Sequence, residues 1–74
     1  MEFNNKNVLV CGIARSGICA ALMLKKLGAN VTIQDLKSKD EIEQINILIE
    51  NEINLYLGKN PDNDLINSID LMVV

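Results

Sequence analysis

The apolar residues of the first half of this chain alternate between strand-like and helix-like segments. Residues 7–11 form a β-branched, apolar run without polar alternation, as expected of a strand buried on both faces of a parallel sheet. Residues 18–27 are rich in Ala, Leu and Met and precede Gly28, which is typical of a helix with a glycine C-cap. Because its apolar residues extend nearly all round, we expect this helix to be covered on two sides. Residues 31–35 form a second β-branched strand that ends in a carboxylate.

The second half of the chain repeats this alternation. Ser38 and Glu41 have the spacing of a capping box, and they lead into Ile42, Ile45 and Ile49 at helical spacing, which predicts a second helix. The pattern then predicts a third strand at residues 53–57, a loop at 58–64, a short helical turn at 65–68 and a fourth buried strand at 70–74. Because an apolar strand simply runs out at the last residue, we expect a fragment of a longer protein.

This order of elements predicts the fold class. Strands that alternate with helices through short loops favour right-handed crossovers, and so an α/β, Rossmann-like parallel sheet with helices on both faces, truncated within or just after the fourth strand. The doubly wound order places the fourth strand beside the first, with the second and third on the other side. The strand order then reverses at the C-terminal end of the first strand, where such sheets bind ligands.

The segment between the first strand and the first helix has the pattern G-x-A-x-x-G, in the context that a nucleotide-binding turn requires. Gly12 permits a tight turn, Ala14 lets the backbone approach a phosphate, and Gly17 lets the helix pack against the sheet. The N–H groups of Arg15, Ser16 and Gly17 lie at the positive end of the helix dipole, where an anion is stabilised. The alternative is a Rossmann-like unit that binds no nucleotide.

Side chains near this turn allow two interpretations each. The Ser16 hydroxyl caps the helix or donates to a phosphate oxygen, and Arg15 adds a charge to the site or is a solvated surface residue. Asp35 follows Gly17 by 18 positions, close to the offset of about 20 at which an acidic residue binds a ribose or another nucleotide donor. The alternative for Asp35 is a solvated strand end. Lys37 and Lys59 follow in loops at the same sheet edge, and both are more typical of plain surface lysines than of ligand contacts.

Composition and charge narrow the function classes. The 74 residues are 49% hydrophobic and 23% charged, as in a globular protein, and the net charge of -3 makes nucleic acid an unexpected partner. Neither a signal peptide nor an apolar run of about 20 residues occurs, so we expect a cytoplasmic protein without a membrane segment. Cys11 and Cys19 lack the spacing of metal ligands, and we expect both to be small core residues.

Several stretches carry a resemblance to a known family. Residues 6–17 (KNVLVCGIARSG), residues 27–32 (LGANVT), Asp35 and, more loosely, Leu57 with Gly58 resemble the N-terminal domain of the bacterial Mur ligases, and within them the member that adds D-glutamate. The resemblance covers essentially the whole chain. It implies that residues 1–74 are a Rossmann-like domain that holds the UDP part of UDP-N-acetylmuramoyl-L-alanine in place of NAD.

The resemblance also implies roles for individual residues. The turn, at Gly12, Ala14, Arg15, Ser16 and Gly17, would hold the diphosphate. Asp35, with Leu36 and Lys37, would hold the uracil, although Leu36 departs from the small polar residue often found there. On this basis Asp35→Ala weakens uridine nucleotides more than it weakens free pyrophosphate.

The reaction that the resemblance implies needs more than this chain. The family joins D-glutamate to the substrate carboxylate through an acyl phosphate, using ATP and Mg²⁺ in peptidoglycan precursor synthesis. No G-x-x-x-x-G-K-[ST] loop occurs here, and in the family the ATP, magnesium and amino-acid sites belong to the central and C-terminal domains. We therefore expect residues 1–74 to bind substrate without catalysing a reaction.

Two other functions fit the same residues. An NAD(P)- or FAD-binding unit of an oxidoreductase uses the same turn and acidic residue, and a ligand-sensing module of a transport regulator is a third possibility. An ATP-loop motif in the sequence beyond Val74 would favour the ligase, whereas a dehydrogenase domain there would exclude it.

Overall fold

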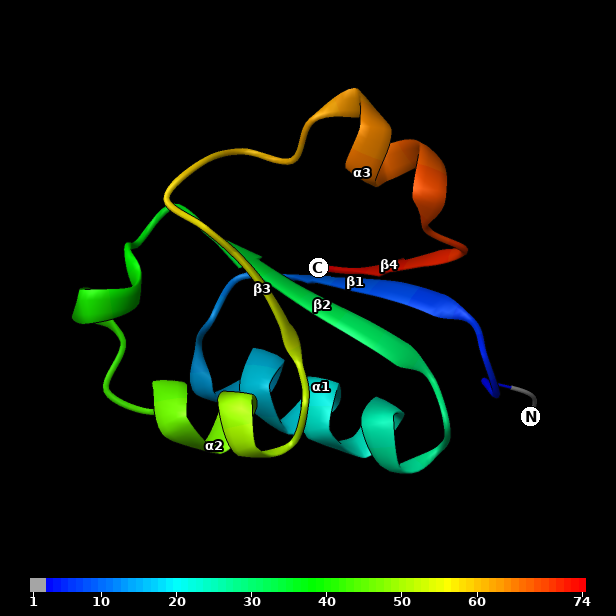
Figure 1. Cartoon of the computed structure of the whole chain (residues 1–74), viewed down its shortest axis with the longest axis horizontal. Helices are drawn as coiled ribbons and strands as arrows, with labels where there is room; N and C mark the ends of the chain where they lie inside the picture. Colours follow the sequence, from blue (N-terminus) through cyan, green and yellow to red (C-terminus); the bar gives the residue numbers. More distant parts are fainter. Residues whose placement is uncertain (1–2) are drawn as a thin grey trace.

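The computed structural model describes residues 3–74, which form one parallel sheet with helices packed on it (Figure 1). In chain order the elements are β1 Asn7–Cys11, α1 Arg15–Lys26, β2 Asn30–Asp35, the 3-10 turn η1 Lys39–Glu41, α2 Ile45–Glu50, β3 Asn54–Leu57, α3 Asn63–Ser68 and β4 Leu71–Val73. The strand order is β3-β2-β1-β4, and every neighbouring pair is parallel. Both the Rossmann-like fold class and the strand order predicted from the sequence are confirmed.

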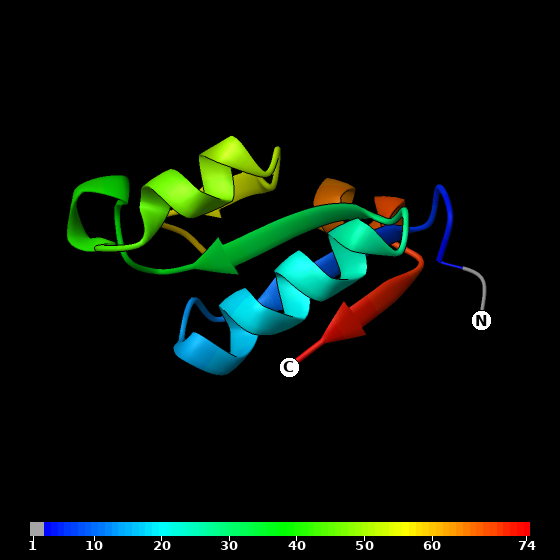
Figure 2. The same ribbon diagram turned by 90° about the horizontal axis from the view of Figure 1, so that it is seen from below.

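Helices cover both faces of this sheet, as predicted. Helices α1 and α2 lie side by side on one face, whereas α3 lies over the other face (Figure 1). Figure 2 shows the same layers from below, with α1 and α2 in front of the sheet. Helix α3 belongs to the connection from β3 to β4. This connection passes from the side of β1 where β2 and β3 lie to the side where β4 lies. The strand order therefore reverses between β1 and β4.

Strand β1 is the centre of the hydrophobic core. Val8, Leu9 and Val10 are each at most 1% exposed, and β1 is a central strand that pairs with β2 on one side and with β4 on the other. Successive strand residues point to opposite faces. Accordingly Val8 and Val10 join the core cluster that includes residues of α1, whereas Leu9 is buried outside that cluster. Burial on both faces explains the absence of polar alternation in this strand.

Helix α1 differs from its prediction in two ways. It begins at Arg15, three residues before the predicted start, and it buries a single stripe formed by Ile18, Ala21 and Leu24. Met23 is 62% exposed and Cys19 is exposed, so the expected cover on two sides and the core position of Cys19 are both wrong. The reason is that only one face of α1 meets the sheet in this arrangement. Cys11, at the end of β1, is half-buried.

The second predicted helix is split. The capping box of Ser38 and Glu41 is present, but it opens the short turn η1 and not α2. Helix α2 starts at Ile45, and its buried residue is Leu48. Ile49, predicted to face the core, is 45% exposed, because the break after η1 moves the apolar stripe of α2 by one position.

Strand β4 is less buried than predicted. Leu71 and Met72 are 43% and 42% exposed, although the strand pairs with β1 along one edge. Within the described residues its other edge has no partner strand, and α3 contributes no buried residue above it. The expectation of a buried fourth strand is therefore wrong for this chain as it stands.

Helices α1 and α2 end in the same hydrogen-bonded motif. At the end of α1, Gly28 has a φ of 94° and donates to Lys25 O, while Ala29 donates to Leu24 O. This confirms the predicted glycine cap. At the end of α2, Ile53 donates to Leu48 O in the same way, but the left-handed position is held by Glu52 with a φ of 60°.

Glu52→Gly is expected to stabilise the chain. A left-handed conformation costs a residue with a Cβ roughly 1 kcal/mol, and glycine avoids that cost. We expect the free energy of unfolding in urea to rise by about 1 kcal/mol. Asn5→Gly is the matched control, since Asn5 has a φ of 64° but asparagine tolerates this region better. An equal or larger gain at Asn5 would contradict the explanation.

Candidate functional site

The turn between β1 and α1 lies where the strand order reverses, at the C-terminal edge of the sheet. Gly12 continues the strand ladder by donating to Gln34 O at 2.7 Å, and then turns with a φ of 99°. Apart from Gly12 and its two chain neighbours, no described residue has an atom within 4 Å of the position that a Cβ on Gly12 would occupy. Glycine is therefore required at this position by backbone conformation and not by crowding.

Gly17 is required for a different reason. A Cβ on this residue would overlap the carbonyl oxygen of Gly12 and would lie 3.6 Å from Val10 Cγ1. The first turn of α1 thus approaches the end of β1 more closely than any side chain would allow. This confirms the predicted role of Gly17 in packing the helix against the sheet.

The first turn of α1 leaves backbone donors without partners. Ile18 N–H donates to Ala14 O at 3.0 Å, the first hydrogen bond of the helix. The amides of Arg15, Ser16 and Gly17 donate to no other residue within 3–74, so no atom of these described residues occupies them. Such donors at a helix N-terminus attract an anion. The arrangement of donors on which the phosphate hypothesis depends is present.

The N-cap of α1 is Ala14, not Ser16. Its ψ of 170° is extended, and its methyl side chain accepts no hydrogen bond. Ser16 lies one residue inside the helix and is exposed. The interpretation of Ser16 as the helix cap is therefore wrong, which leaves its hydroxyl available to a ligand.

A small cavity opens beside these donors. It has a volume of about 160 Å³ and is lined by Gly12, Ala14, Ser16 and Gly17 from the turn, and by Val73 and Val74 at the end of β4. The lining thus joins the two strands between which the strand order reverses. Ligands bind at this place in open parallel sheets.

Asp35, at the C-terminal end of β2, is bonded to the turn itself. Its Oδ2 accepts from Ile13 N–H at 2.7 Å, and its Oδ1 accepts from Lys37 N–H at 2.9 Å. The Lys37 amide, followed by the Ile13 amide, lowers the pKa of this carboxyl below its ordinary value of 3.8, against a smaller opposing effect of burial. Asp35 is therefore charged at neutral pH and linked to the backbone next to Gly12.

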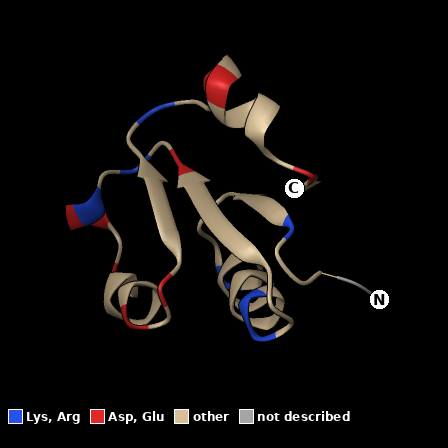
Figure 3. Cartoon of the chain, turned by 45° about the vertical axis from the view of Figure 1, so that its right-hand side comes forward, with Lys and Arg blue, Asp and Glu red and all other residues tan. Residues whose placement is uncertain are grey.

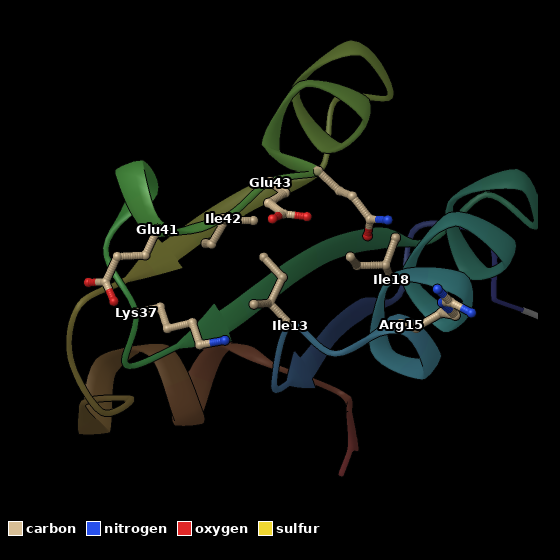
Figure 4. A pocket seen from close by; sticks show the side chains of 8 residues that line it. Ile13, Arg15, Ile18, Lys37, Glu41, Ile42 and Glu43 are labelled. Atoms are coloured by element: carbon tan, nitrogen blue, oxygen red, sulfur yellow. The ribbon is translucent and has the colours of Figure 1, made fainter.

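The charged side chains at this edge surround a second, larger cavity. It has a volume of about 350 Å³, and Figure 4 shows Arg15 and Lys37 on either side of Ile13, with Glu41 and Glu43 along the opposite wall.

Helix α1 carries basic residues at both ends and no acidic residue in its first turn, whereas acidic residues occur on α2 and α3 (Figure 3). The positive end of α1 is thus not neutralised by its own sequence.

The remaining predicted residues lie close to Asp35. Leu36 is 64% exposed, and Lys37 is exposed beside the larger cavity. Lys59 is exposed, as expected of a surface lysine, and its Nζ lies 4.6 Å from the centre of the Tyr56 ring. The Tyr56 hydroxyl in turn donates to Asp62 Oδ2 at 2.9 Å.

Gln34 is a residue at this edge that sequence reasoning missed. It is only 7% exposed, and its Nε2 donates to Lys59 O at 2.9 Å. It thereby ties the loop after β3 to the end of β2. A polar residue within an otherwise apolar strand was the available signal, since a buried amide needs a hydrogen-bond partner.

Two features of the described residues bear on other ligand classes. Across residues 3–74, none of the helices has the length and apolar character that crossing a membrane requires. Within the same residues, His, Cys, Asp and Glu side chains form no group of three suited to a metal ion.

Comparison with known proteins points to one kind of enzyme, although no protein-family model matches the chain. A UDP-N-acetylmuramoylalanine--D-glutamate ligase of Ligilactobacillus salivarius is 42% identical over 72 residues, which is 97% of this chain and 16% of that protein. The ligase of the same name from Pediococcus pentosaceus is 44% identical over 73 residues, with the same two coverages. The one from Streptococcus mutans is 49% identical over 60 residues, or 81% of this chain and 13% of that protein.

The chain is homologous to these ligases. The resemblance inferred from the turn, from residues 27–32 and from Asp35 is therefore confirmed. The chain spans only 16% of the length of the first two relatives, so most of each ligase has no counterpart in these residues. The relatives are ligases by name, and the homologous part is the α/β unit described above.

Proposed function

We propose that residues 1–74 are the N-terminal domain of a ligase and bind the UDP part of UDP-N-acetylmuramoyl-L-alanine. The observation that carries this proposal is the set of backbone amides at Arg15, Ser16 and Gly17, which have no acceptor among the described residues. They lie at the reversal of the strand order, beside a cavity of about 160 Å³. A diphosphate supplies acceptors for several such donors at once.

The nucleoside belongs on the other side of the turn. Asp35, Leu36 and Lys37 lie at the end of β2, and the Ile13 amide links this segment directly to the turn. Leu36 offers an exposed apolar surface on which a base can rest, and the Lys37 side chain faces the cavity of about 350 Å³. We therefore assign the diphosphate to Gly12, Ala14, Arg15, Ser16 and Gly17, and the uracil to the Asp35 segment.

The chemistry of the whole ligase belongs to other domains. We propose that they bind ATP, Mg²⁺ and D-glutamate and form the amide bond in the cytoplasm, during synthesis of a peptidoglycan precursor. Residues 1–74 then contribute binding energy from a remote nucleotide, which positions the reacting carboxylate. The chain alone is expected to have no ligase activity.

Chemical-shift mapping on this chain tests the proposal. Titration with UDP is expected to shift the backbone amide resonances of residues 14–17, because their N–H groups are the proposed donors. Uridine without phosphate is the matched ligand, and its shifts are expected mainly at Asp35 to Lys37. We expect a dissociation constant for UDP of about 1 mM, since the rest of the ligase is missing.

The competing function is an NAD(P)- or FAD-binding unit, for which the turn and Asp35 are equally suited. The homology to ligases whose name includes UDP-N-acetylmuramoylalanine favours the uridine nucleotide. NADH is accordingly expected to shift the amides of residues 14–17 much less than UDP at equal concentration. Larger shifts with NADH would reverse the ranking of the two functions.

A further inference from the structure

The Asp35 carboxylate, at the end of β2, is hydrogen-bonded to two other segments: the β1–α1 turn and the loop after β2. One oxygen accepts from Ile13 N–H in the β1–α1 turn, 22 residues away, and the other accepts from Lys37 N–H in the loop after β2. The backbone of this loop is held as well, because Gly58 N–H donates to the carbonyl oxygens of Asp35 and Lys37 at 2.9 and 3.0 Å. The carboxylate is therefore a fixed acceptor and not a mobile side chain.

Ile13 is the residue through which this acceptor acts on the turn. It stands between Gly12, with its positive φ, and Ala14, the N-cap of α1. Its side chain is only 9% exposed and packs in the core cluster. With its side chain buried and its amide bonded to Asp35, the peptide that leads into the free donors has a single orientation.

We propose that Asp35 is a positioning residue for the diphosphate: its carboxylate holds the Ile13 amide and thereby aims the amides of Arg15, Ser16 and Gly17 at the anion. This inference rests on the proposed function, and it adds a role that differs from contact with the uracil. A donor array that is already oriented loses less entropy on binding than a flexible turn does.

The charge state of Asp35 suits this role. The hydrogen bonds from Lys37 and Ile13 lower its pKa, and the charged groups facing it are the Lys37 ammonium and the Glu41 carboxylate of η1. A carboxyl with a lowered pKa in the folded state contributes stability above its unfolded pKa, and this contribution is lost as the pH falls through the lower folded value. The turn is therefore held throughout the neutral range and is released only in acid.

A pH titration of the unmodified chain tests the hydrogen bond itself. The amide resonances of Ile13 and Lys37 are expected to titrate together with the Asp35 carboxyl carbon, with a midpoint below the ordinary aspartate value of 3.8. The Asn30 amide is the internal control, because it donates at the opposite edge of the sheet to the backbone carbonyl of Lys6, which does not titrate. An Ile13 amide that does not follow Asp35 would overturn the proposal.

Pyrophosphate binding to variants tests the effect on the turn. Asp35→Ala is expected to weaken inorganic pyrophosphate about tenfold, because one charge-assisted hydrogen bond that orients the donors is lost. Removal of a negative charge alone would strengthen anion binding, so a loss reports the geometry of the turn. Asp70→Ala is the matched control, because it also removes one negative charge and one acceptor of a backbone amide, but far from the turn. This variant is expected to bind pyrophosphate as the unmodified chain does.

Other outcomes separate this inference from the proposed function. Unchanged or tighter pyrophosphate binding in Asp35→Ala would overturn the positioning role, even if UDP binding fell. If the unmodified chain bound pyrophosphate but preferred NADH to UDP, the uridine assignment would fail, while a tenfold loss in Asp35→Ala would still support the positioning role.

Discussion

Gly17→Ala is expected to unfold a large fraction of the chain and to remove diphosphate binding from what stays folded. The new Cβ would overlap the carbonyl oxygen of Gly12, a backbone atom that cannot rotate away. Overpacking of this kind costs about 1–3 kcal/mol, a large share of the stability of so short a chain. Alanine would otherwise favour a helix by up to about 1 kcal/mol, so any destabilisation measured by urea unfolding reports the clash.

Gly28→Ala is the matched control for this variant. Gly28 has a φ of 94°, and a Cβ there would meet Asn4, so a comparable loss of unfolding free energy is expected. Gly28 follows the C-terminal end of α1, at the edge of the sheet opposite the turn. The folded fraction of Gly28→Ala is therefore expected to bind pyrophosphate as the unmodified chain does. Intact diphosphate binding by folded Gly17→Ala would contradict the close-approach explanation.

Leu48→Ala is expected to cost about 2–5 kcal/mol of unfolding free energy, because it leaves a cavity in the core. Leu48 is fully buried, whereas its neighbour Ile49 is 45% exposed. Ile49→Ala is therefore expected to cost less than about 1 kcal/mol. The pair tests the register of α2 directly, since the predicted spacing placed Ile49 in the core. A larger loss at Ile49 than at Leu48, in urea unfolding, would favour the predicted register.

The features that follow from local chemistry were predictable. The buried run of β1, the glycine turn after it and the glycine cap at Gly28 each depend on residues within a few positions of one another. The parallel strand order follows from the alternation of strands and helices together with the handedness of crossovers. For these features the sequence alone was sufficient, and it also led to the relatives that the comparison found.

Other features depend on contacts between distant segments. Which side of α1 meets the sheet decides that Cys19 is exposed, and the break after η1 decides that Leu48 and not Ile49 is buried. The exposure of β4 depends on which elements cover it. Periodicity specifies that a helix has an apolar stripe. A small shift in where the helix begins changes which residues of that helix face the sheet.

At the candidate site, too, some features could be predicted from the sequence and others depend on contacts between distant segments. By themselves, the residue types and spacing of the turn and of Asp35 predicted a nucleotide site at this edge of the sheet. Only the tertiary structure decided that the amides of Arg15, Ser16 and Gly17 have no partners among residues 3–74, and that Asp35 is bonded to Ile13. The physical reason is that a hydrogen bond between residues 22 positions apart exists only after β1 and β2 have paired.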